Sequence, residues 1–238
     1  MSRINRGRPA ATALAGALVG YSLTAGLPVA GRRHPAVQAT LGTALALAAR
    51  APLGLRGAPA RAGLRLGAAA AAVVTLGVSA ATAIPAVRDG MRDRVVPTPG
   101  WKWLTVQIPL GTVWSEETMY RGALSAVAVD AFGPVAGNLL QATAFGLSHI
   151  ADARGTGEPV VGTVLATGAA GWAFGRLAAR SGSLIAPVLA HLAVNEAGAI
   201  AAMTVQRDRG DDGAAQARRD LFSGACEGHS HIAAGSAE

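Results

Sequence analysis

Two adjacent glutamates and an arginine interrupt a largely apolar stretch between residues 101 and 129 of this sequence. Each ionised group at the centre of a membrane span costs about 2.5–3.5 kcal/mol on insertion scales, so these groups are expected to face a cavity or one another. Glu117 and Arg121 are four residues apart, so they share a helix face and can form an ion pair. Glu116 points about 100° away from Glu117 and has no such partner. Its carboxylate is therefore the candidate general base.

An ion pair that merely fixes helix packing would explain Glu117 and Arg121 equally well. A second carboxylate beside the pair is harder to explain as packing. Glu116 therefore favours chemistry over a purely structural role at this place.

Two further pairs of residues lie on other apolar segments, each pair with a spacing of four. Phe145 precedes His149, and His191 precedes Asn195. Either pair could be structural, since polar side chains also hold membrane helices together. If the three segments pack against one another, however, they enclose a base, two imidazoles and an amide donor. Such a set can activate a water molecule and stabilise an oxyanion.

Long apolar segments must position these residues. The chain of 238 residues is 51% hydrophobic and only 15% charged, and short Arg-rich segments separate the apolar runs. This pattern is typical of membrane spans with polar connections. We expect seven helices, with eight as the alternative, at 10–30, 36–50, 62–87, 101–129, 135–150, 159–179 and 184–205. The expected fold class is all-α, a polytopic transmembrane helical bundle.

The expected domain organisation is one transmembrane helical domain, 1–205, whose motif-bearing part is 101–205. Residues 206–238 are rich in Gly, Ala, Ser, Arg and Asp and poor in large apolar side chains. We interpret them as a disordered polar tail.

The net charge of +7 comes almost wholly from arginine. A nucleic-acid-binding protein presents such charge on a soluble fold, and this chain has little soluble character. Arginines that flank spans instead lie at lipid headgroups. The expected partner is the lipid bilayer, with no nucleic acid. The apolar run at 10–30 follows three arginines as in a signal peptide, but its length suits a complete span.

The three motifs resemble the CPBP family, which comprises CAAX-processing endopeptidases and bacteriocin-immunity proteins and is also called Abi. The pattern is E-E-x-x-x-R, then F-x-x-x-H, then H-x-x-x-N, in that order, with one apolar helix between the second and third motifs. The resemblance covers residues 101–205. The residues that carry it are Glu116, Glu117, Arg121, Phe145, His149, His191 and Asn195.

The resemblance implies an intramembrane endopeptidase in which Glu116 and His149 hold and activate the attacking water. His191 and Asn195 would then hydrogen-bond the developing oxyanion. The substrate would be a membrane-associated peptide or protein.

The remaining motif residues would support that site. Glu117 and Arg121 would orient the catalytic groups, and Phe145 would help to wall the substrate cavity. The resemblance to Abi proteins also implies a multi-pass protein of a bacterial cell membrane.

The metal dependence of such a site stays open at the level of sequence. A glutamate and two histidines are also a plausible zinc set, which here would be Glu116, His149 and His191. We favour a water activated without a metal, and therefore expect no cofactor, with zinc as the alternative.

Two other functions compete with the endopeptidase. A non-catalytic membrane scaffold or immunity protein could reuse the fold, although it would have no need for an unpaired Glu116. A transporter also places charge inside the membrane, but many transporters contain an internal repeat, and the sequence shows none.

Overall fold

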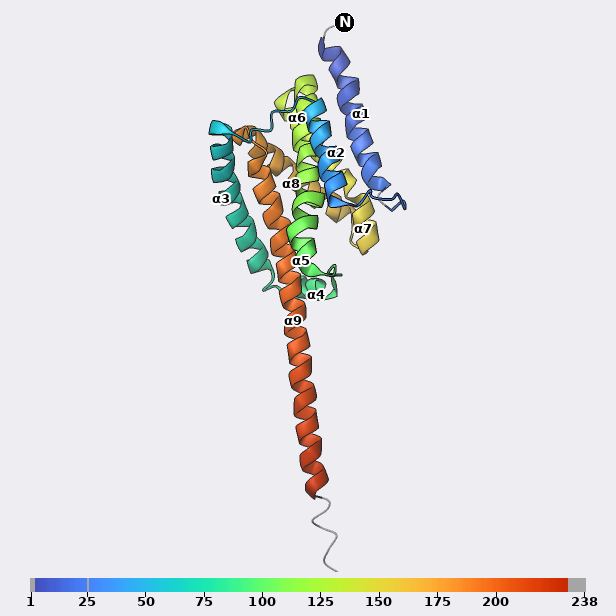
Figure 1. Cartoon of the computed structure of the whole chain (residues 1–238), viewed down its shortest axis with the longest axis vertical. Coiled ribbons are helices and arrows are strands. Elements are labelled where there is room, and N and C mark those ends of the chain that lie inside the picture. Colours follow the sequence, from blue (N-terminus) through green and yellow to red (C-terminus); the bar gives the residue numbers. More distant parts are fainter. Residues whose placement is uncertain (1–2, 25, 231–238) are drawn as a thin grey trace, which may run out of the picture. The chain divides into compact units, whose positions relative to one another are not determined.

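The computed structural model describes residues 3–24 and 26–230, and within these ranges it contains helices and no strands. The expected all-α fold class is confirmed. Figure 1 shows the helices in chain order. They are α1 (Arg3–Leu23), α2 (Pro35–Ala48), α3 (Gly57–Ala81), α4 (Pro85–Asp93), α5 (Gly100–Lys102), the π-helical segments η1 (Trp103–Trp114) and η2 (Glu117–Leu124), α6 (Ser125–Ser148), α7 (Ile150–Thr156), α8 (Val160–Ser181) and α9 (Ile185–Ser230).

The chain divides into two compact units. The first comprises Met1–Gly77 and Pro97–Glu196, and the second comprises Val78–Val96 and Ala197–Glu238. All residues of the three motifs belong to the first unit. Within this unit α6 lies beside both α1 and α8, and α2 packs against η1 and η2 (Figure 1).

Four stretches of the described residues are long and apolar enough to cross a membrane: Gly57–Ala81, Gly100–Thr156, Val160–Ser181 and Ile185–Asp208. The helix α2 is apolar but shorter. The first expected span, at 10–30, is not among these four. The helix there ends at Leu23, and Gly26 and Pro28 follow in a non-helical segment.

The expected helix at 62–87 is divided into α3 and α4. The break falls just before Pro85, which begins α4. Proline disfavours a helical conformation in the residue before it, and Ile84 is accordingly extended, at φ −78° and ψ 123°. The short helix α7 occupies a segment that we expected to be a loop.

The longest apolar stretch folds back on itself at Gly133. This glycine adopts φ 81° and ψ 170°, a conformation that favours glycine, and Pro134 follows it. A Cβ added at Gly137 would lie 2.7 Å from the backbone nitrogen of Val129, so the chain returns closely alongside the preceding helix. The expected turn between the helices at 101–129 and 135–150 is therefore present.

Small residues let α8 approach α6 closely. A Cβ added at Gly171 would lie 3.0 Å from the Phe145 ring, and one at Gly146 would lie 2.6 Å from the Val164 carbonyl oxygen. Such small residues at helix contacts are typical of membrane bundles. This packing places Phe145 of the second motif against α8.

The last helix, α9, is assigned to Ser230, and 231–238 lie outside the described residues, so the expected disordered polar tail at 206–238 stays a prediction. The segment contains no proline, and its alanines, arginines and Gln216 are good helix formers. In the second unit the Gln206 side chain donates to the carbonyl oxygens of Met91 (3.1 Å) and Arg94 (2.8 Å).

Candidate active site

The first motif forms a buried ion pair on η2. Arg121 Nη1 lies 3.1 Å from Glu117 Oε1, and neither side chain is exposed. A π-helix has a slightly wider turn than an α-helix, but residues four apart still meet on one face. The ion pair expected from their spacing is present.

Aromatic rings cover the Arg121 guanidinium. Its carbon lies 4.0 Å from the Phe145 ring centroid and 5.1 Å from that of Phe174. None of the three guanidinium nitrogens makes a hydrogen bond. One carboxylate and two ring faces thus compensate this buried charge, since a cation is attracted to the face of an aromatic ring.

His191 joins the third motif to the first. Its Nδ1 lies 2.8 Å from Glu117 Oε1, and its ring stacks on Phe174 with centroids 5.1 Å apart. A carboxylate only accepts hydrogen bonds, so Nδ1 carries the proton and donates it. Glu117 is therefore held by both Arg121 and His191.

Glu116 lies in a different environment from its neighbour. Its side chain is 27% exposed, and its Oε2 is 3.8 Å from His191 Nε2, which is too long for a hydrogen bond. This Oε2 is shielded from solvent and has no hydrogen-bond partner. The two adjacent carboxylates thus differ, because Glu117 is enclosed and bonded to Arg121 and His191, whereas Glu116 is partly open and only approaches His191 at 3.8 Å.

His149 lies between α6 and α7. Its Nδ1 is 2.8 Å from the Phe145 carbonyl oxygen, which can only accept, so Nδ1 is a donor. In the neutral ring this leaves Nε2 as a free acceptor. Among the described residues His149 makes no hydrogen bond to Glu116.

The Phe145 ring separates the two histidines. Its centroid lies 4.7 Å from that of His149 and 6.0 Å from that of His191, both in edge-to-face geometry. Phe145 is 2% exposed. It therefore contacts the imidazoles and the Arg121 guanidinium from inside the bundle, and its expected role as a wall of the substrate cavity stays a prediction.

Asn195 uses its amide within its own helix. Its Nδ2 donates to the His191 carbonyl oxygen over 3.1 Å. Asn195 and His191 share a face of α9, as their spacing indicates. The amide nitrogen carries two hydrogens, so Nδ2 keeps a second donor beside this bond.

The sequence motifs do not include two aromatic residues that belong to the site. Phe174 on α8 contacts both Arg121 and His191, and Tyr120 packs edge-to-face on Phe145 at 5.1 Å. Only 4% of the chain is aromatic, so a phenylalanine on an apolar helix facing the motifs is a usable signal. It becomes informative only once α8 is known to pack on α6.

The possible zinc set is not assembled in this arrangement. In the part of the chain that the structure describes, no three His, Cys, Asp or Glu side chains converge closely enough to hold a metal ion. Glu116 and His191 approach each other, but His149 is bonded to the backbone of its own helix.

Comparison with known proteins supports the interpretation of the motifs. Residues 98–197 match the family model of type II CAAX prenyl endopeptidase Rce1-like proteins. The resemblance to the CPBP family is confirmed over this segment, which contains all three motifs. No curated protein and no solved structure matches the chain. The match supports a CAAX-type intramembrane endopeptidase activity, and the apolar helices indicate an integral membrane protein.

Proposed function

From the Rce1-like match and the geometry of the site, we propose that this chain hydrolyses a peptide bond of a membrane-associated protein or peptide with a water activated by Glu116 and His149. The observation that carries the proposal is the contrast between two adjacent carboxylates. Glu117 is enclosed by Arg121 and His191, whereas Glu116 is partly exposed and has no hydrogen-bonded partner. A general base requires such a carboxylate, free to take a proton.

In the proposed reaction Glu116 accepts a proton from water as the water oxygen bonds to the carbonyl carbon. The carbonyl oxygen becomes the oxyanion of a tetrahedral intermediate. When the intermediate collapses, the C–N bond breaks and the proton held by Glu116 passes to the leaving amine. One water is consumed, and the products are a carboxylate and an amine.

His149 would orient the water. Its Nδ1 is held by the Phe145 carbonyl oxygen, so the ring is fixed and Nε2 can accept a hydrogen bond from the water. We place the water between Glu116 and His149 in the substrate complex, where catalytic contacts commonly shorten.

His191 and Asn195 would stabilise the oxyanion. His191 Nδ1 is engaged by Glu117, so donation to the oxyanion comes from Nε2 of the protonated ring. Asn195 would contribute the second N–H of Nδ2, since the first donates to the His191 carbonyl oxygen. Removing one such donor from an enzyme typically lowers kcat by about 10²–10³-fold.

The experiment compares the wild type with Glu116→Gln in proteoliposomes against a pool of tagged membrane proteins and peptides. The substitution keeps the size of the side chain and removes its basicity. Glu158→Gln, at an exposed position beyond α7, is the matched control. We expect cleavage by the wild type and the control and none by Glu116→Gln. Equal cleavage by all three would refute the role of Glu116.

A non-catalytic scaffold or immunity protein is the second candidate. It is favoured by the Asn195 amide bonded within α9 and by the lack of a His149–Glu116 hydrogen bond among the described residues. If the wild type cleaves nothing in the pool, and Glu116→Gln retains any cellular phenotype of the wild type, the scaffold becomes the better account.

A further inference from the structure

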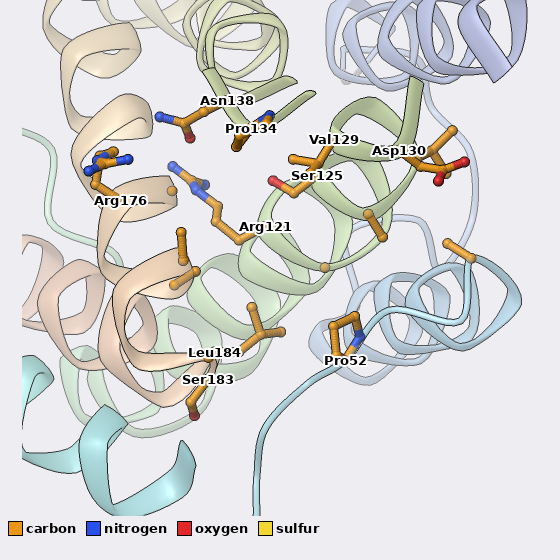
Figure 2. A pocket seen from close by; sticks show the side chains of 18 of the residues that line it. Pro52, Arg121, Ser125, Val129, Asp130, Pro134, Asn138, Arg176, Ser183 and Leu184 are labelled. Atoms are coloured by element: carbon orange, nitrogen blue, oxygen red, sulfur yellow. The ribbon is translucent and has the colours of Figure 1, made fainter. Parts of the chain in front are cut away.

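A second cavity lies beside the candidate active site. Its volume is about 780 Å³, and its lining includes Arg50, Arg121, Asp130, Asn138 and Arg176 (Figure 2). Of the motif residues only Arg121 belongs to this lining. The cavity is therefore distinct from the place where Glu116 and His149 would act.

The cavity lies at one end of two candidate membrane spans. The helices α8 and α9 are both long and apolar enough to cross a bilayer, and Gly182–Leu184, which join them, line the cavity. A connection this short keeps the adjoining helix ends together, so this end lies at a membrane surface. Lipid headgroups occupy that depth, and arginines near helix ends contact them.

The charges in the lining favour an anion. The lining contains three arginines, Arg50, Arg121 and Arg176, and one carboxylate, Asp130. Arg121 is fully buried and paired with Glu117, its nitrogens make no hydrogen bond within the part of the chain that the structure describes, and in Figure 2 its guanidinium points toward Asn138 and Arg176. An oxyanion would supply acceptors to these donors, and arginine suits phosphate especially well.

An apolar groove continues from the cavity between α6 and α8. It has a volume of about 610 Å³ and shares Pro134, Asn138 and Arg176 with the cavity. Its other side chains include Val135 and Trp172, which are 71% and 49% exposed, and a further arginine, Arg180. A ligand that fills both spaces has an anionic end and an apolar chain.

We propose that this cavity binds the headgroup phosphate of an anionic phospholipid, with an acyl chain along the α6–α8 groove. The arginines attract the phosphate, and the Asp130 carboxylate repels it. The groove contacts the acyl chain, which free phosphate lacks. Arg121 also pairs with Glu117, so a bound lipid contacts the network that holds His191. The cavity shares Arg121 with the candidate active site, but this inference does not rest on the proposed peptidase activity, and its test requires no substrate.

The test titrates the delipidated, full-length protein in detergent with dioctanoyl phosphatidylglycerol and counts bound lipid by native mass spectrometry. Dioctanoyl phosphatidylcholine and inorganic phosphate are the comparison ligands. We expect Arg176→Gln to weaken phosphatidylglycerol binding about tenfold, as loss of one charge-assisted hydrogen bond would. The matched control, Arg61→Gln, removes an exposed arginine of α3 outside the cavity and should bind like the wild type.

Asp130→Asn should have the opposite effect on affinity. It removes the carboxylate of the cavity lining, so phosphatidylglycerol should bind more tightly. A merely damaged fold would not produce such a gain. As a local readout, phosphatidylglycerol with brominated chains should quench fluorescence of the wild type more than that of Trp172→Phe.

Three outcomes would overturn the proposal. One is equal phosphatidylglycerol affinity in the wild type and Arg176→Gln, and another is equal affinity for free phosphate and for the lipid. The third is displacement of the lipid by a peptide with a free C-terminal carboxylate at a lower concentration than phosphatidylglycerol requires. That result would assign the cavity to a peptide instead.

Discussion

Similar residues have opposite environments on the two sides of the candidate active site. The buried cluster consists of Glu117, Arg121 and His191, in which every member contacts another and almost nothing is exposed. The open pair consists of Glu116 and His149, of which Glu116 is partly exposed and His149 keeps one ring nitrogen free. The adjacent glutamates thus have different environments, and we expect them to have different tasks. A paired carboxylate positions its neighbours, whereas an unpaired one can accept a proton.

The largest expected effect comes from removing the base of the open pair. Glu116→Gln should lower the rate of peptide cleavage by about 10²–10⁴-fold, the contribution typical of a general base. Because Glu116 has no hydrogen-bonded partner, the thermal unfolding temperature in detergent should stay close to that of the wild type. A variant with normal activity but poor stability would place Glu116 in the buried cluster instead.

The buried cluster should respond in stability as well as activity. Arg121→Met leaves Glu117 without its cation, and loss of one partner of a buried pair costs about 3–5 kcal/mol of unfolding free energy. Chemical unfolding in mixed micelles measures this loss.

The double variant Glu117→Leu/Arg121→Met sharpens this test, since an apolar replacement of a buried pair is often neutral or stabilising. We expect it to regain stability while remaining inactive. If the single variant were as stable as the wild type, the pair would contribute nothing to the fold.

A smaller loss is expected at the second member of the open pair. His149→Ala should lower cleavage by about 10²-fold, the lower end of the range for acid–base groups. Added imidazole should partly restore activity by entering the space that the ring leaves. No rescue, together with a lowered unfolding temperature, would indicate that His149 is a structural residue of α7.

The smallest expected effect is that of a chelator. If Glu116 and His149 activate the water without a metal, EDTA or 1,10-phenanthroline should leave the cleavage rate of the purified protein unchanged. Loss of activity that zinc restores would contradict this and would indicate that Glu116 and His149 are metal ligands. The assay includes a zinc peptidase, which both chelators must inhibit.

Local features of the chain predicted much of the fold and part of the site. Apolar segment lengths located α2, α8 and the hairpin that turns at Gly133, because hydrophobicity and turn residues act over short distances. The Glu117–Arg121 pair followed from a spacing of four on one helix. An expectation failed where a single residue changed the local structure, as at Pro85, which divides the expected helix at 62–87.

The sequence by itself determined the helical class, the order of the motifs and the pair within η2, since each depends on residues close together in the chain. The tertiary structure decided which glutamate is enclosed, because that depends on His191, which lies 74 positions from Glu117 in the sequence. It also brought Phe174 onto Arg121 and gathered the arginines of the second cavity. These contacts join different helices, and helix packing, which no local pattern specifies, determines them.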